Sequence, residues 1–368
     1  MPLSLLRSWR SCARPLLWPP QLRYLRSDAA LEAIAKAAEE RTPAVVLYNY
    51  PSFSGAFSAL FAYLFHSSLK IPCLVLPFSS VVPLRVDDLC VEGLRTCYLL
   101  DFIGPKEFAV ELSRKTASEV ICFDHRKSAL SKLPHPEEPS GKVTFHIDLG
   151  KSSSSAVYEY FSSKLKDVTS TDENGAAKSL VDINSQDRVE SLLRYLEDGD
   201  LRCWRFPDIK AFNIGISEWR SKLNCITNPH MYKQLLVMSV GELIAQGNSH
   251  ISTRKDAAME FVGKAFKLQL GRGLYGECLG VRADSNPDLS DEIGRELSLR
   301  SAAAGLRPIG AVIFMQRKNL KMCLRSTDDS TDTSEIAKAY GGGGLPHSSS
   351  FIIRMDEYNQ WLSINSSS

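Results

Sequence analysis

Short, largely apolar segments alternate with helical patterns along the first half of the chain. The apolar segments cover residues 44–48, 73–76, 96–101, 119–124 and 142–148. Strands of this kind are buried on both faces, which is typical of parallel sheets, and the helical patterns between them supply the crossover connections. The sequence therefore predicts an α/β fold with a largely parallel sheet in this half.

The last hundred residues have a different pattern. Strands are predicted at 276–283, 309–317 and 320–325, with helices at 291–303 and 333–340. Residues 231–269 are predicted to be mostly helical, with one break at 247–250. We therefore expect a parallel-sheet domain at 28–205, a helical connector at 206–264 and a smaller α/β domain at 265–368.

The charge of the chain is unevenly distributed. Residues 1–27 contain five arginines, four serines and no acidic residue, which is the composition of an organelle transit peptide. A disordered basic tail is the alternative. We expect import into the mitochondrion, with the chloroplast as the other destination. Because the whole chain has a net charge of +2, the other residues carry −3, and recognition of phosphate must depend on a few local side chains.

Two predicted strands end in carboxylates. Asp101 and Asp124 each end an apolar segment, and the ends of parallel strands meet at one edge of the sheet, where ligands bind. His125 follows Asp124, and Asp200 ends a helical pattern further along the chain. Carboxylates with an imidazole suit Mn²⁺ or another first-row divalent ion. A solvated turn or a helix cap is the plainer explanation of an Asp-His pair.

Four consecutive glycines follow the predicted helix at 333–340. They are Gly341, Gly342, Gly343 and Gly344. Such a run permits positive φ angles and can present several backbone N–H groups as a concave anion-binding nest. A flexible connector between a helix and a strand is the alternative.

Several separate motifs follow one another in an order found in a known family. They are Asp124-His125 with Ala129, Leu324-Arg325-Ser326, Ile336-Ala337-Lys338, the four glycines, Ser348-Ser349-Ser350 and Phe351. With these motifs the chain resembles the DHH phosphoesterase superfamily with its C-terminal DHH-associated domain. The resemblance covers nearly everything after residue 42. It implies a DHH-like domain, a helical connector and a smaller DHH-associated domain.

Members of this superfamily include single-strand exonucleases, oligoribonucleases, cyclic-dinucleotide phosphodiesterases and inorganic pyrophosphatases. They use two metal ions, usually manganese, that activate water and clamp the attacking and leaving oxygens. Four motifs supply the ligands. The resemblance assigns Asp101 to the second motif, Asp124 and His125 to the third, and Asp200 to the fourth.

The sequence departs from the family at several ligand positions. Tyr48 stands where the family has His, Ser52 and Ser54 stand where it has Asp, and Arg126 replaces the second His of the third motif. Neutral hydroxyls cannot neutralise two divalent ions in a shared site, and a fixed cation repels a metal ion but pairs with phosphate. We therefore expect one Mn²⁺ or Mg²⁺ ion, or none.

The glycine motif departs as well, because Leu345 stands where the family has His and His347 lies two residues further on. The residues left to bind phosphate are Arg126, Arg325, Gly341, Gly342, Gly343, Gly344 and His347.

These observations are compatible with three functions. The first is a phosphoesterase-like protein that binds a nucleotide or short single-stranded nucleic acid with impaired hydrolysis. The second is an active manganese-dependent phosphodiesterase or oligoribonuclease with an altered metal centre. The third is a non-catalytic structural or assembly protein, and a homodimer is a further partner to test. No apolar segment approaches the about 20 residues that a membrane span needs, so no membrane span is expected.

Overall fold

The computed structural model describes residues 28–362, except for positions 82, 106, 135–141, 170–178 and 285. The predicted transit peptide lies outside the described residues. The chain forms two compact units, Met1–Ile209 with Ile216–Val240 and Lys210–Gly215 with Gly241–Ser368. Among the described helices, none is both long enough and apolar enough to cross a membrane.

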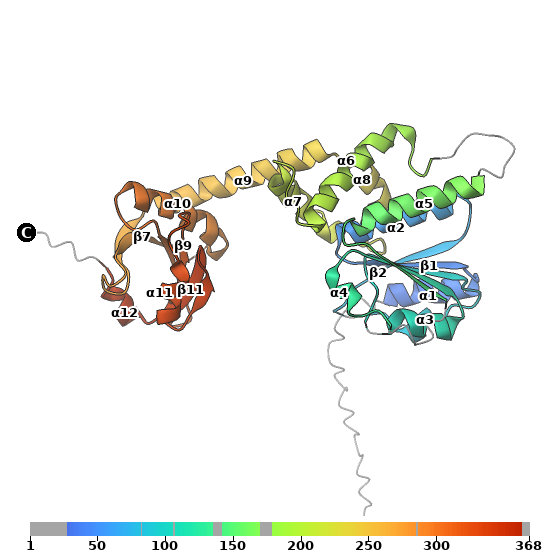
Figure 1. Cartoon of the computed structure of the whole chain (residues 1–368), viewed down its shortest axis with the longest axis horizontal. Helices are drawn as coiled ribbons and strands as arrows, with labels where there is room; N and C mark the ends of the chain where they lie inside the picture. Colours follow the sequence, from blue (N-terminus) through green and yellow to red (C-terminus); the bar gives the residue numbers. More distant parts are fainter. Residues whose placement is uncertain are drawn as a thin grey trace, which may run out of the picture. The chain divides into compact units, whose positions relative to one another are not determined.

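The first unit is built on a five-stranded sheet of order β2-β1-β3-β4-β5 in which every pairing is parallel (Figure 1). The strands are β1 (Ala44–Asn49), β2 (Cys73–Phe78), β3 (Thr96–Leu100), β4 (Glu119–Asp124) and β5 (Val143–Ile147). The predicted α/β class with a parallel sheet is confirmed. Leu100 of β3 pairs with Tyr48 of β1 and Phe123 of β4, so these strands end together.

Helices cover both faces of this sheet (Figure 1). The helices α1 (Asp28–Glu39) and α3 (Phe108–Thr116) pack on one face, and α2 (Phe53–Ser68) and α5 (Ser153–Thr169) pack on the other. On the second face, the ring of Phe161 lies 5.0 Å from that of Phe65 and 5.3 Å from that of Tyr98, measured between centroids. Because both faces are buried, the strands are apolar on both sides.

The first unit contains further helices outside the two layers. They are α4 (Lys127–Leu130), α6 (Ile183–Asp200), α8 (Met231–Val237) and two short 3-10 helices at Val86–Leu89 and Arg220–Lys222. Asp200 is the last residue of α6, as the helical pattern in the sequence predicted.

The second unit has a six-stranded mixed sheet of order β10-β11-β9-β8-β7-β6, in which β7 and β8 are the parallel pair. The strands are β6 (Phe266–Gln269), β7 (Glu277–Arg282), β8 (Gly310–Gln316), β9 (Asn319–Arg325), β10 (Gly343–Leu345) and β11 (Ser348–Ile353). One face packs against α10 (Ser290–Ala303) through Ile293 and Leu297. The other packs against α11 (Thr333–Ala339) and the segment that follows α12 (Met355–Asn359), through Ile336 and Trp361.

The predicted helix break at 247–250 is wrong. The helix α9 runs without interruption over Val240–Val262, and the interruption lies earlier, between α8 and α9. Gly247 is used for close packing: a Cβ atom there would lie 1.9 Å from the carbonyl oxygen of Ala211 in α7 (Ile209–Ser217). Gly215 makes the reciprocal approach, because its Cβ would lie 2.0 Å from the carbonyl oxygen of Leu243. The glycines therefore allow two helix backbones to touch.

We expect Gly247→Ala to lower the free energy of unfolding by about 2 kcal/mol, because the methyl group must push a helix backbone away. Thermal unfolding followed by calorimetry measures the change. Gly263→Ala is the matched control, since a Cβ atom there would meet nothing closer than 3.6 Å. Equal melting temperatures for the two variants would contradict the close helix crossing.

Candidate functional site

Asp101 is the central residue of the candidate site. It follows β3 with a φ angle of +64°, and it is 1% exposed. Its Oδ2 atom accepts hydrogen bonds from Ser52 Oγ at 2.6 Å and from Asn49 Nδ2 at 2.9 Å. Burial raises the pKa of Asp101, but His125, Arg126 and these two donors outweigh burial, so the net pKa is lowered. The carboxylate is therefore kept ionised.

Arg126 follows β4 and reaches across to the end of β3. Its Nε donates to Asp124 Oδ1 at 2.9 Å, while its Nη2 donates to the carbonyl oxygen of Asp101 and lies 3.7 Å from Asp101 Oδ1. Burial lowers the pKa of Arg126, but the charges of Asp101 and Asp124 raise it by more. The guanidinium is thus a permanent cation between two buried carboxylates.

His125 links the two strand ends to α5. Its Nδ1 atom lies 2.9 Å from Ser153 Oγ and 3.3 Å from Asp101 Oδ1. Asp101 Oδ1 has no aligned hydrogen-bond donor among the described residues, so this second contact is mainly one of charge. Burial lowers the pKa of His125, whereas Asp101 and Asp200 raise it by more, and the net effect favours the imidazolium.

Asp200 approaches the same group from the end of α6. Its Oδ2 accepts a hydrogen bond from Ser54 Oγ at 2.5 Å, and Ser54 Oγ lies 3.0 Å from Ser154 Oγ. Burial raises the pKa of Asp200 to about 6, although the hydrogen bond from Ser54 opposes the shift. The charge of Asp101 raises this pKa further, and the charges of His125 and Arg126 lower it. Asp101, Asp124 and His125 therefore form one cluster with Arg126, and Asp200 interacts with this cluster through its charge.

The spacing of this cluster suits a metal ion, but the positive charge of Arg126 within it does not. One ligand atom from each of Asp101, Asp124 and His125 lies within 4.8 Å of the others. Asp124 Oδ1, however, already accepts from the backbone N–H groups of His125 and Arg126 at 2.8 and 3.1 Å as well as from Arg126 Nε. Asp101 Oδ1 has no such donor, but a divalent ion bound beside it would face the Arg126 guanidinium, whose Nη2 lies 3.7 Å from the same oxygen. The residues as arranged do not fit the two-ion centre of the family.

Tyr48, the predicted counterpart of the His in the first motif, does not contact the cluster and instead bonds to the segment at Leu223 and Cys225. Its hydroxyl donates to the carbonyl oxygen of Leu223 at 2.7 Å and accepts from the backbone N–H of Cys225 at 3.0 Å. Side chains alternate across a strand, so Tyr48 points to the opposite face from Asn49. Tyr48 anchors the segment before α8, and Asn49 contacts Asp101 in its place.

Sequence reasoning missed Asn49, Ser153 and Ser154. Asn49 ends β1 just as Asp124 ends β4, so the strand-end rule that identified the carboxylates could have found it. Ser153 and Ser154 are the first two residues of α5, and they meet His125 and Ser54 only because α5 returns to the same edge of the sheet.

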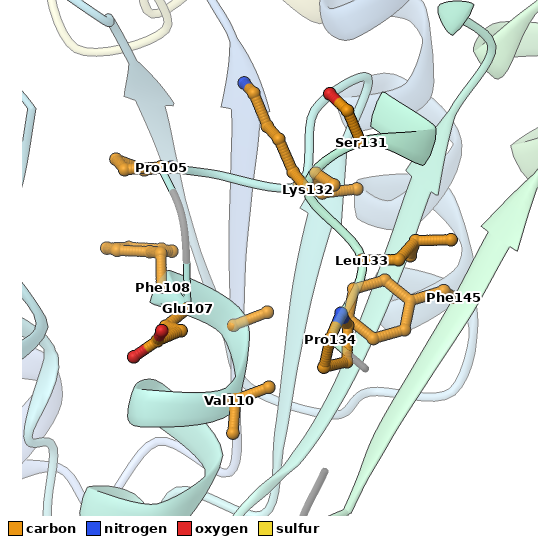
Figure 2. Close-up of a pocket in the computed structure, with 11 residues that line it drawn as sticks. Pro105, Glu107, Phe108, Val110, Ser131, Lys132, Leu133, Pro134 and Phe145 are labelled. Atoms are coloured by element: carbon orange, nitrogen blue, oxygen red, sulfur yellow. The ribbon is translucent and has the colours of Figure 1, made fainter. Parts of the chain in front are cut away.

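A pocket of about 290 Å³ lies beside the cluster. Among the residues that line it are Asn49, Asp124, Arg126, Ser128 and Lys132. A smaller pocket of about 130 Å³ shares Ile103, Pro105 and Lys132 with it. Figure 2 shows the smaller pocket, with the apolar side chains of Phe108, Val110, Leu133 and Phe145 around it and the Lys132 side chain extending away from them.

The predicted phosphate-binding residues of the second unit lie around β9, β10 and β11. Arg325 Nε pairs with Asp291 Oδ1 at 2.9 Å, and His347 Nε2 lies 3.7 Å from Asp329 Oδ1. The N–H groups of Gly341 and Gly342 donate to the carbonyl oxygens of Lys338 and Ala337 at 3.0 and 2.8 Å. Gly343 and Gly344 belong to β10, which pairs with β11. These bonds favour the connector interpretation at Gly341 and Gly342, whose N–H groups are already engaged.

The first unit is therefore a parallel α/β domain whose strand ends carry a cluster of carboxylates, an imidazole and a guanidinium. No family model and no curated protein matches the sequence. Among solved structures, the chain is similar to the pGpG-specific phosphodiesterase PggH from Vibrio cholerae, with 12% identity, a TM-score of 0.36 and coverage of 86% of this chain and 95% of that one.

The chain is also similar to RecJ in complex with Mn²⁺ from Thermus thermophilus, with 16% identity, a TM-score of 0.30 and coverage of 90% of this chain and 53% of that one. An exopolyphosphatase-related protein from Bacteroides fragilis has 13% identity, a TM-score of 0.30 and coverage of 91% and 94%. At such low identity and TM-score these likenesses carry no argument about activity, which depends on the residues of the site.

Proposed function

We propose that this DHH phosphoesterase-like protein binds a nucleotide or a short single-stranded nucleic acid and hydrolyses it poorly or not at all. The observation that carries the proposal is the position of Arg126, whose guanidinium joins Asp124 to the end of β3 where the family would hold metal ions. Ser52 and Ser54 support it, because their hydroxyls hydrogen-bond to Asp101 and Asp200 in place of coordinating an ion.

The pocket beside the cluster has the chemistry to bind a phosphate group. Arg126 retains 40% exposure of its side chain, and Lys132 and the hydroxyl groups of Ser80 and Ser128 line the same space. Charge-assisted hydrogen bonds from such groups are the strong contacts of phosphate sites. A volume of about 290 Å³ is near the lower limit for small-molecule sites, which suits a phosphate with part of its nucleoside.

An active phosphodiesterase with an altered metal centre is the second candidate. The observation in its favour is the 4.8 Å spacing of ligand atoms from Asp101, Asp124 and His125. Such an enzyme would need Arg126 to leave its two carboxylate partners when substrate and metal bind.

The test is titration calorimetry of the full chain with a mononucleotide in EDTA and again in Mn²⁺, combined with a search for hydrolysis products of short RNA. We expect binding in EDTA and no product. Lys132→Ala should weaken binding about tenfold by removing one charge-assisted contact. Lys36→Ala on α1 is the matched control, because Lys36 is exposed and pairs with Glu40 at 3.7 Å. Mn²⁺-dependent hydrolysis by the unaltered chain would establish the second candidate.

A further inference from the structure

The loop that follows α6 presents an aromatic ring between two cations. Trp204 is 56% exposed, and Arg202 and Arg205 are exposed on either side of it in sequence. We propose that this loop is a stacking site for a base of single-stranded nucleic acid, with the two arginines binding the flanking phosphates. The inference rests on the proposed function and selects single-stranded nucleic acid over a mononucleotide as the ligand.

The loop is held in a defined conformation by a buried carboxylate. Asp198 is 4% exposed, and both of its carboxylate oxygens accept the backbone N–H of Arg205 at 3.0 Å. Its carbonyl oxygen accepts the N–H of Cys203 at 3.0 Å, and the N–H of Arg202 donates to the carbonyl oxygen of Gly199 at 3.2 Å. The indole is therefore carried by a fixed backbone, which reduces the entropy lost when a ligand binds.

The backbone of the loop adopts a conformation of high free energy, and packing of Trp204 into the core does not compensate for it. Arg202 and Trp204 both have φ angles of +54°, a region that bulky residues rarely adopt. Strained residues of this kind cluster at ligand-binding sites. The next aromatic residue shows the contrast: Phe206 stacks on Tyr195 with ring centroids 4.3 Å apart, whereas the ring of Trp204 is left largely in solvent.

The position of the loop connects it to the candidate site. Trp204 is four residues after Asp200, which receives the hydrogen bond from Ser54, and four residues span at most about 14 Å. A ligand with a phosphate at the cluster and further nucleotides beyond it could therefore reach the indole. The exposed arginines before and after Trp204 in the loop favour an anionic chain, and base stacking on an exposed aromatic ring is tolerant of sequence.

The experiment measures binding of labelled eight-nucleotide RNA and DNA by fluorescence anisotropy and of a mononucleotide by calorimetry, with the full chain in EDTA. We expect Trp204→Ala to weaken oligonucleotide binding about 5- to 100-fold and to leave mononucleotide binding unchanged. Trp204→Phe should restore most of the affinity. Trp219→Ala is the matched control. This indole is half-buried, and the Lys222 ammonium already lies over its ring, 4.2 Å from the centroid.

The outcomes separate the two proposals. Equal oligonucleotide affinity for Trp204→Ala and the unaltered chain, with mononucleotide binding intact, overturns the stacking site and leaves the proposed function standing. Absence of binding to both ligands overturns both. Capture of a protein through Trp204 with no oligonucleotide binding also overturns the stacking site, since the loop would then be a protein contact. The RNA and DNA measurements decide which nucleic acid the loop prefers.

Discussion

Replacing Ser52 and Ser54 with Asp and Arg126 with His is expected to make the protein dependent on Mn²⁺ for its stability. Ser52 Oγ lies 2.6 Å from Asp101 Oδ2, and Ser54 Oγ lies 2.5 Å from Asp200 Oδ2. A carboxylate at each position would face another carboxylate, and the compensating guanidinium would be absent. In EDTA this arrangement should cost about 5 kcal/mol, the upper range for uncompensated buried charges.

Mn²⁺ should restore much of the lost folding stability, because the same carboxylates and the two imidazoles at positions 125 and 126 form a set of metal ligands. A ligand present at 100 times its dissociation constant stabilises the folded state by about 2.7 kcal/mol. Differential scanning calorimetry with and without Mn²⁺ measures the effect, and the same variant can be assayed for hydrolysis.

The control combines Ser52→Asn, Ser54→Asn and Arg126→His, which changes size in the same way without adding carboxylates. Its melting temperature should not respond to Mn²⁺. If the unaltered chain binds Mn²⁺ as tightly as the carboxylate variant, Arg126 does not exclude the metal and our interpretation of the cluster is incorrect.

Asp200 should lower the stability of the unaltered protein as the pH rises from about 4 to about 6, and Asp200→Asn should remove this contribution. The pKa of Asp200 is raised from 3.8 to about 6 in the folded protein, chiefly by burial. Between these values the folded state holds a proton that the unfolded state has released, so each increase in pH favours unfolding. A shift of about two pKa units corresponds to a change of about 3 kcal/mol in the free energy of unfolding.

The asparagine variant should match the unaltered protein near pH 4, where Asp200 is protonated, and should be about 3 kcal/mol more stable at pH 7. Urea unfolding at a series of pH values measures this difference. His125 affects the folding stability at a higher pH. Its raised pKa contributes stability that is present below about pH 6.5 and is lost as the pH rises through the pKa of the folded state.

The control for Asp200→Asn is Asp208→Asn, because Asp208 is exposed. A pH profile that is the same in Asp200→Asn and the unaltered chain would show that Asp200 ionises freely.

The candidate site was predictable in part. Asp101, Asp124 and His125 could be placed at one edge of the sheet, because strands that are apolar throughout must be parallel and buried, and parallel strands end together. Tyr48 and Asn49 could not be assigned in this way. They are neighbours on one strand, and the direction of each side chain depends on the register and on the segment at Leu223 that Tyr48 meets.

The role of Arg126 was also beyond the sequence. An arginine beside an aspartate can point to solvent, bind a ligand or pair with its neighbours, and the choice depends on the distance to a strand 25 residues away. Gly247 is a second residue whose role could not be assigned from the sequence. As a residue type it suggests a helix break, and only the approach of Ala211 shows that its missing side chain allows two helices to pack.

The sequence by itself determined the class of fold and the edge of the sheet that holds polar groups, because these depend on residue type and periodicity along the chain. The departures at positions 52, 54 and 126 are what the resemblance to the DHH phosphoesterase superfamily implies. The tertiary structure decided how those groups are paired: Ser52 with Asp101, Ser54 with Asp200, and Arg126 between the ends of β3 and β4. Pairing is set by contacts between segments far apart in the chain, and buried charges are stable only where such contacts compensate them.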